Sequence, residues 1–482
     1  MVAERLSPLD AAFLEIEQGD ECSHMHVGWA MIFDPAPGGT PDVRMLRRRI
    51  AERIVAMPRF TRRLSAPRSG GLSWPMWEDD PMFDIGAHLR HATLPAPGGD
   101  AELLDWLGDF YSHRLDRTRP LWEITLLDGL EADRWALAMK AHHCLIDGVS
   151  GSVVTAMLLD SAPDGTPALP IEPAPAPSAA GPGGLIGLAR TGVDVMLHPR
   201  KLIDMLERSR ALAELLRESL VPAADTSLNV PIGAARRMAV VDASLDDFKA
   251  IKRSLGGKVN DVALAAAAGG MRDVLLSRGE QPPEQGIRVM VPVSLRGDAE
   301  MTSLGNRVSS LFVELPVAEP DPLTRYLKTL EATQALKAGN QAIGTETLLD
   351  VAGVTPPVIH ATIARASFGA RLFNVTITNV PGSPVTLYAF GAPMRRIVPN
   401  VPIFANHAVG IAVVSYDGGI AFGLNGDRMA MPDIHVLEHG IERSLEELKR
   451  LGSSGSTTRR SAAAWSSSRS ATRSQTASSP SR

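Results

Sequence analysis

The sequence predicts a mixed α/β protein built from two large domains. Its 482 residues exceed one typical domain, since a domain contains roughly 150 residues. Segments with strand-like alternation and segments with helical spacing of apolar residues follow one another in both halves. A proline-rich stretch separates the halves. We therefore expect two layers of sheet and helix on either side of a linker.

Composition is that of an ordinary globular protein and excludes several classes of function. Hydrophobic residues make up 44% and charged residues 21%, so the chain can bury a full core. A formal net charge of −5 on so long a chain gives no reason to expect a nucleic-acid partner. Only Cys22 and Cys144 are present, too few for a disulfide framework and without zinc-ligand spacing, so no metal site is expected.

The same features predict a cytoplasmic location. Met1 to Asp10 carries charged residues and lacks the apolar core of a secretory signal. The longest apolar stretch, 262–271, has ten residues, whereas a membrane-spanning helix needs roughly 20. Peripheral attachment to the inner membrane face or to lipid droplets stays open, because one apolar face is enough for it.

The first domain is expected over residues 1–160, and a linker region follows over 161–225. Residues 161–184 contain seven prolines, which are excluded from helix interiors and central strands. From Leu185 to Leu220 apolar residues recur at helical spacing, which predicts two amphipathic crossover helices broken at His198-Pro199. We interpret these helices as packing against both domains, with contact between their apolar face and lipid as the alternative.

Residues 226–451 are expected to form the second domain, and residues 452–482 a disordered tail. The tail is rich in serine and contains five arginines and no acidic residue. Turn residues at 416–419 predict a hairpin between the last two strands of the domain. Strands are expected at 238–241, 287–293, 311–315, 374–380, 387–390, 407–415 and 420–425, with helices from about Ser244, after Asn260-Asp261 and after Pro432.

The residues best suited to chemistry follow the apolar strand at 135–141. That strand leads into His142 and His143, and Asp147 and Gly148 follow before an apolar helix. Loops at strand ends commonly carry catalytic groups. A hydroxyl group is a poor nucleophile without a base, and imidazole is the side chain best matched to that role near neutral pH. One of the two histidines can therefore act as a general base.

Consecutive residues of a strand point to opposite faces, so His142 and His143 cannot both enter one cleft. We expect one to be catalytic and the other to support it. Asp147 can hold the local backbone or pair with a cation, and Gly148 allows a turn or a close approach by substrate. Taken singly, each residue has a structural explanation, because a lone histidine is usually structural and Asp-Gly is usually a turn.

The whole pattern, HHxxxDG between a strand and a helix, resembles the signature of the chloramphenicol-acetyltransferase-like superfamily. Within that superfamily the chain resembles the bacterial wax ester synthase/diacylglycerol acyltransferase (WS/DGAT) family. The resemblance runs from residue 6 to about 450 and leaves out the basic tail. Its other segments are LSPLDAAFL at 6–14, RPLWE at 119–123, VNDV at 259–262, VPVSLR at 291–296, LGNR at 304–307 and NVPG at 379–382.

This resemblance implies two chloramphenicol-acetyltransferase-like domains with the active site in a tunnel between them. It implies an O-acyltransferase that moves a long-chain acyl group from acyl-CoA to diacylglycerol or to a long-chain alcohol. Acyl-CoA is then a substrate, and no cofactor is expected. His143, the second histidine of the motif, is implied to be the proton acceptor, and the acyl group is expected to pass directly to the acceptor without an acyl-enzyme.

The resemblance also implies roles for residues beyond the histidines. Asn260 is expected to face His143 across the tunnel, where it could orient substrate or donate to an oxyanion. Asp261 is either a substrate contact or the cap of the helix that begins there. Asp147 is expected to give structural support, and a weak alignment nominates Arg63 as its partner. Gly148 is expected to contact substrate.

Two further assignments concern apolar surroundings. Pro120, Leu121 and Trp122 are candidate substrate contacts, although such a run more often sets a turn and fills a core. Cys144 lies beside the histidines but is expected to be buried and inert.

The alternative of another class is a non-catalytic lipid-binding or lipid-droplet scaffold, against which the intact HHxxxDG and ND motifs argue. A condensation domain is a second alternative, but no adjacent carrier domain is present.

Overall fold

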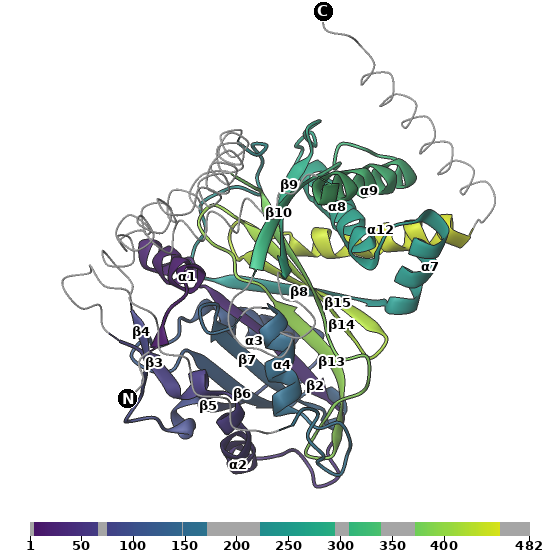
Figure 1. Ribbon diagram of the computed structural model, residues 1–482. Coiled ribbons are helices and arrows are strands. Elements are labelled where there is room, and N and C mark those ends of the chain that lie inside the picture. The colour runs from purple at the N-terminus through teal and green to yellow at the C-terminus, as the bar shows by residue number, and fades with distance from the viewer. Residues whose placement is uncertain are drawn as a thin grey trace, which may run out of the picture.

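A computed structural model describes residues 4–65, 75–146, 148–170, 222–294, 308–338 and 372–453. Within them, two six-stranded sheets and one three-stranded sheet form the framework, and helices pack against it (Figure 1). Several predicted features lie outside the described residues. They are the amphipathic linker helices, Asp147, the LGNR motif at 304–307 and all but the first two residues of the basic tail.

The first large sheet comes mostly from the N-terminal half. Its order is β12-β13-β2-β7-β6-β5, and only the β5–β6 pair is parallel. The central strands β2 and β7 are buried along their whole length. The strands are β2 (His26–Phe33), β5 (Leu89–Thr93), β6 (Trp122–Asp128), β7 (Trp135–His142), β12 (Tyr388–Ala389) and β13 (Ala392–Asn400).

The second large sheet comes entirely from the C-terminal half. Its order is β10-β9-β11-β14-β15-β8, with β11 parallel to both of its neighbours. The hairpin predicted at 416–419 is present, with Tyr416 paired to Gly419 and both turn residues at positive φ. The strands are β8 (Arg236–Ser244), β9 (Ile287–Ser294), β10 (Val308–Leu315), β11 (Val375–Pro381), β14 (Val409–Tyr416) and β15 (Gly419–Asp427).

Sheet membership does not follow the predicted boundaries at 160 and 226. Strands β12 and β13 belong to the C-terminal half, yet β13 pairs with β2 of the first sheet, and Figure 1 shows the two side by side. No strand is predicted at Ala392–Asn400, a segment that contains adjacent arginines and Pro399. A register shift between Met394 and Arg396 accommodates this irregular segment. The two halves are therefore joined by sheet hydrogen bonds.

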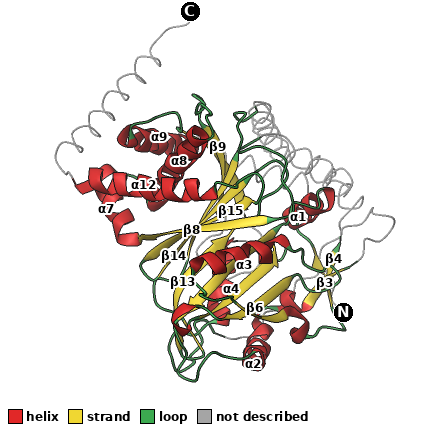
Figure 2. Ribbon diagram, turned by 180° about the vertical axis from the view of Figure 1, so that it is seen from behind, coloured by secondary structure: helices red, strands yellow, loops and turns green. Residues whose placement is uncertain are grey.

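Helix α8 (Val259–Ser277) explains the longest apolar stretch of the sequence. Its residues 262–271 are buried, so the stretch serves the core of the second half. Helix α12 (Ile434–Ser453) packs closely against it, since a Cβ on Gly270 would lie 2.7 Å from Cγ1 of Ile441. Figure 2 shows α8, α9 (Pro322–Ala338) and α12 gathered on one side of the second sheet.

The other elements complete the layers. Helix α7 begins after Ser244 as predicted, with the Ser244 hydroxyl capping the backbone N–H of Asp246. The other α-helices of the described residues are α1 (Pro8–Gly19), α2 (Val43–Arg53), α3 (Asp100–Ser112), α4 (Gly148–Leu158), α7 (Leu245–Leu255) and α9 (Pro322–Ala338). The three-stranded sheet has the order β1 (Glu4–Arg5), β4 (Met76–Asp79) and β3 (Arg62–Leu64).

Candidate active site

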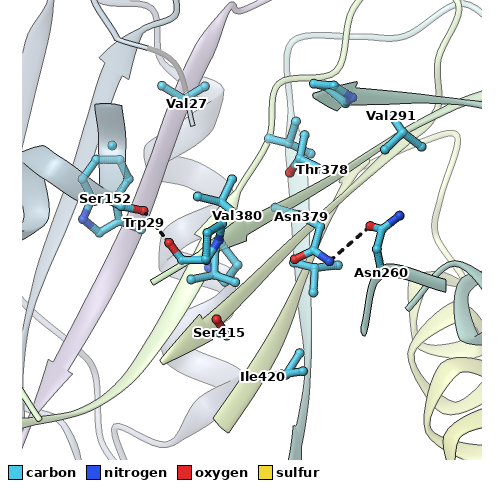
Figure 3. A pocket seen from close by; sticks show the side chains of 18 of the residues that line it. Val27, Trp29, Ser152, Asn260, Val291, Thr378, Asn379, Val380, Ser415 and Ile420 are labelled. Atoms are coloured by element: carbon cyan, nitrogen blue, oxygen red, sulfur yellow. Dashed lines mark hydrogen bonds between the residues drawn. The ribbon is translucent and has the colours of Figure 1, made fainter. Parts of the chain in front are cut away.

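A cavity of about 670 Å³ lies between the two large sheets. Its wall is mostly apolar, and side chains from both halves contribute to it (Figure 3). On the N-terminal side, β2 and α4 supply residues such as Trp29 and Ser152, and the Ser152 hydroxyl donates to the Pro381 carbonyl across the junction. On the C-terminal side the wall comes from α7, α8, α9 and strands β9, β10, β11, β13, β14 and β15.

His143 lines this cavity immediately after the end of β7. Its backbone N–H donates to the Met25 carbonyl at 2.7 Å, which ties the turn to the start of β2. The imidazole stacks on the ring of Phe13 from α1, with centroids 4.0 Å apart and planes 28° apart. The side chain is half-buried. His143 therefore sits where a base can reach a substrate inside the cavity.

His142 points the other way, as strand alternation predicts. It is 1% exposed and is absent from the cavity wall. Its Nδ1 accepts from the backbone N–H of Cys144 at 3.1 Å, so Nε2 carries the ring proton and donates to Glu17 at 3.2 Å. This pair of bonds holds the turn that carries His143, which gives His142 a supporting position.

Glu17 from α1 is the centre of a buried charge cluster behind the turn. Arg117, Arg114 and His26 approach its carboxylate at 3.1, 3.5 and 3.7 Å. Burial alone would raise the pKa of Glu17, but the hydrogen bond from His142 and the nearby positive charges hold it well below its usual range. No sequence pattern predicts a role for Glu17, because only the tertiary structure brings its partners together.

Cys144 is completely buried, and burial raises the pKa of its thiol well above the ordinary value. Because the thiolate is the nucleophilic form, this cysteine is inert toward a thioester.

Asn260 reaches the cavity from the opposite half of the molecule. It is the second residue of α8, and its Oδ1 accepts from Nδ2 of Asn379 at 3.2 Å (Figure 3). Among the described residues its amide nitrogen has no hydrogen-bond acceptor, so this donor is available to a ligand. The structure thus brings His143 and Asn260, separated by more than a hundred residues, to one cavity.

Asp261, the alternative substrate contact, turns away from the cavity. It is 3% exposed, and its carboxylate accepts from the backbone N–H of Lys258 at 2.8 Å. Asp261 is the third residue of α8, and its side chain caps the backbone N–H of Lys258 as in a capping box, so the capping interpretation holds; Asp261 does not line the cavity. Asp147 is outside the described residues, Gly148 begins α4, and Arg63 pairs with Glu78 at 3.0 Å.

The Pro120-Leu121-Trp122 segment belongs to the core, which corrects its assignment to substrate binding. Leu121 and Trp122 are at most 2% exposed, and none of the three residues lines the cavity. The indole Nε1 of Trp122 donates to the Phe60 carbonyl at 2.7 Å, and the ring stacks on His88 at 4.5 Å. An apolar run after a proline fills the interior beneath the sheet here.

Trp122→Phe is expected to lower the free energy of unfolding by about 1–2 kcal/mol, because the Phe60 carbonyl loses its buried donor. The Michaelis constants for the two substrates that the resemblance implies, acyl-CoA and the acceptor alcohol, should not change. Urea unfolding and steady-state kinetics measure the two effects. Trp135→Phe is a matched control, since Trp135 is fully buried and its Nε1 has no partner among the described residues. If Trp122→Phe raised KM and left the stability unchanged, the result would support Trp122 as a substrate contact.

Comparison with known proteins places the chain in a family. Residues 6–263 match the wax ester synthase/diacylglycerol acyltransferase catalytic domain, and residues 304–449 match the WS/DGAT C-terminal domain. A Mycobacterium tuberculosis protein named probable diacylglycerol O-acyltransferase is 31% identical over 465 residues, covering 94% of this chain and 98% of that protein. The chain belongs to the WS/DGAT family. A second relative from that organism, with the same enzyme name, is 33% identical and covers 92% and 98% of the two chains.

Solved structures agree on the fold of this WS/DGAT protein. The wax ester synthase/diacylglycerol acyltransferase of Marinobacter aquaeolei is 27% identical with a TM-score of 0.67, and the match covers 93% of this chain and all of that one. The first condensation domain of the calcium-dependent antibiotic synthetase superposes with a TM-score of 0.62 at 18% identity over 93% and 97% of the chains, a likeness of fold alone. The chloramphenicol-acetyltransferase-like fold is thereby confirmed, and family membership makes the protein an acyltransferase. Among its described helices, none is long and apolar enough to cross a membrane.

Proposed function

We propose that this WS/DGAT protein transfers a long-chain acyl group from acyl-CoA to the hydroxyl of diacylglycerol or of a long-chain alcohol. The main observation in support is that His143 and Asn260, which come from opposite halves of the chain, line the same mostly apolar cavity. A base and an amide donor facing one apolar space are what ester formation from a thioester requires.

His143 takes the proton of the acceptor hydroxyl as that oxygen attacks the thioester carbonyl. The new C–O bond forms, the carbonyl oxygen becomes an oxyanion, and the intermediate collapses with loss of the C–S bond. The imidazolium of His143 then returns the proton to the departing CoA thiolate, so ester and free CoA are the products. Because the acceptor attacks directly, no acyl-enzyme forms, and the buried thiol of Cys144 takes no part.

Asn260 is assigned to the developing oxyanion. Its Oδ1 is engaged by Asn379, which leaves the amide N–H groups to donate and fixes the plane of the amide. A preorganised donor of this kind contributes more in a water-poor cavity than at the surface. The C-terminal half thus supplies electrostatic stabilisation, and the N-terminal half supplies the base.

The apolar wall suits long aliphatic chains and excludes the water that would hydrolyse the thioester. Side chains such as Leu264, Val291 and Leu311 line the part of the cavity that belongs to the second half. The chemistry calls for no metal and no cofactor, because acyl-CoA is consumed as a substrate. Since both acceptors partition into membranes and lipid droplets, we propose a cytoplasmic protein that exchanges substrate with such surfaces.

Release of free CoA by the purified protein tests the proposal. Palmitoyl-CoA is supplied with dipalmitoylglycerol, with hexadecanol or without acceptor, and the product lipids are separated. We expect CoA release that depends on acceptor, with triacylglycerol or wax ester formed in equal amount. Binding of these lipids without any CoA release would instead indicate the non-catalytic scaffold.

A further inference from the structure

The second sheet is split beside the candidate active site. Among the described residues, β11 pairs with β9 only through Val375 and Thr376, although both strands run on beyond this contact. Continued pairing would set Thr378 opposite Pro292, and a proline has no N–H to donate to a neighbouring strand. Each strand stays paired along its other edge, β9 with β10 and β11 with β14. A gap therefore opens between β9 and β11.

The cavity reaches both faces of the second sheet at this gap. Asn379 points to the face covered by α8, where it bonds to Asn260, so the next residue, Val380, points to the opposite face. Figure 3 shows this division, with Val380 toward Trp29 and Asn379 toward Asn260. All four residues line one cavity, and so does His143. One part of the cavity thus lies on the side of the base and another on the side of α8.

The part of the cavity on the side of α8 and α9 is mostly apolar, and we call it the helix-side lobe. Its wall includes residues of α8, β9, β10 and α9, namely Val259, Asn260, Leu264, Val291, Leu311 and Leu336. Leu311 shares its face of β10 with Val313, a residue of the core around α8. Leu311 and Leu336 are half-buried, so a ligand can contact both side chains. Such a wall suits methylene groups better than amides or phosphates.

The place of the oxyanion decides which aliphatic chain enters this lobe, given the proposed function on which this inference rests. Under that function Asn260, in the wall of the lobe, donates to the oxygen of the thioester carbonyl. The acyl chain is bonded to that carbonyl carbon, whereas the acceptor hydroxyl must approach His143 from the other face of the sheet. We infer that the acyl chain of the donor passes the gap between β9 and β11 and lies in the helix-side lobe. The acceptor chain then stays on the side of His143 and Trp29.

Kinetics with chains of two lengths tests this assignment. CoA release is measured with palmitoyl-CoA and octanoyl-CoA on hexadecanol, and with palmitoyl-CoA on hexadecanol and octanol. Leu311→Trp fills the lobe and should lower kcat/KM for palmitoyl-CoA about tenfold or more relative to octanoyl-CoA, because each methylene kept out of an apolar site weakens binding about fourfold. The ratio between hexadecanol and octanol should not change. Leu336→Trp fills the same lobe from α9 and serves if the first variant does not fold.

Val414→Trp is the matched control on the other face of the sheet. Val414 is also a half-buried residue of the cavity wall, but it packs against the core of the N-terminal half. This variant should change the ratio between the two alcohols and leave the ratio between the two donors as in the wild type. Equal losses on both donors with Leu311→Trp would place the CoA arm in the lobe, and a changed alcohol ratio would place the acceptor there. Either result, or an unchanged donor ratio, overturns the inference.

Direct binding separates this inference from the proposed function. If the wild-type protein turns over neither donor, the proposed function fails, and calorimetric titration with palmitoyl-CoA and octanoyl-CoA still tests the lobe. Tighter binding of the longer chain that is lost in Leu311→Trp and kept in Val414→Trp would uphold the assignment. Loss of this preference in both variants, or in neither, would remove it, as would equal affinity of the wild type for the two donors.

Discussion

Replacing His143 by alanine is expected to lower kcat/KM for acyl transfer by about 100- to 10,000-fold, the usual contribution of a positioned general base. The side chain enters the cavity, so no other described residue can take the acceptor proton from the same place. The effect should fall on kcat, because proton removal belongs to the transition state and contributes little to ground-state binding. Steady-state release of CoA measures it.

The imidazole is half-buried and stacks on Phe13, so the folded state of the variant is measured beside its activity. His435→Ala is a suitable control, because His435 is exposed on α12 and does not line the cavity. Circular dichroism and thermal unfolding check that the variants are folded. Retention of most of the wild-type kcat by a folded His143→Ala would exclude this residue as the base.

Replacing Glu17 by alanine is expected to lower the free energy of unfolding by about 2–3 kcal/mol, the cost of removing a buried charged hydrogen-bond acceptor. Glu17 is 2% exposed and is the carboxylate that faces Arg117, Arg114 and His142. Without the carboxylate, the buried N–H of His142 loses its acceptor, whereas the arginine side chains are 27–34% exposed and can turn to water. Urea unfolding measures the loss.

Activity should fall together with stability in this variant, because His142 then loses the partner that fixes its ring. Glu52→Ala is the control, since Glu52 pairs with Arg48 on the exposed face of α2. An exposed pair of this kind contributes little. A Glu17→Ala protein as stable as the Glu52→Ala protein would show that water or rearranged side chains compensate the cluster.

The same cluster predicts a pH dependence of stability. The folded-state pKa of Glu17 lies below its ordinary value of 4.5, so the folded state favours the carboxylate. The stabilisation of the folded state by the Glu17 carboxylate is fully present above the unfolded-state pKa. It is lost as the pH falls through the folded-state pKa. The difference in unfolding free energy between wild type and Glu17→Gln should thus be largest near neutrality and shrink under acid conditions. A difference that stays constant from neutral pH to the acid limit would contradict this assignment.

Local pattern was sufficient for several features of the candidate site. Alternation along the strand at 135–142 separates the two histidines onto opposite faces, and the structure places only His143 in the cavity. The start of an apolar helix at Asn260-Asp261 likewise predicts α8 and its cap. These features depend on residues close together in the chain, so spacing alone can reveal them.

Other assignments failed because they depend on which surface a segment meets. The Pro120-Leu121-Trp122 run has the composition of either a core or an apolar substrate site, and only packing beside Phe60 and His88 distinguishes them. Glu17 carries no local signal for its role, because its hydrogen-bond partner His142 lies more than a hundred residues away in sequence.

By itself, then, the sequence determined the mixed α/β class, the family resemblance, the hairpin at 416–419 and that only one of the two histidines can face a cleft. The tertiary structure alone decided that β13 crosses to pair with β2, that a single cavity joins His143 to Asn260 and that Glu17 balances the charges behind the turn. The physical reason is the distance along the sequence between the residues that interact. Backbone periodicity and capping are local, whereas strand pairing and the desolvation of buried charges depend on contacts between distant segments.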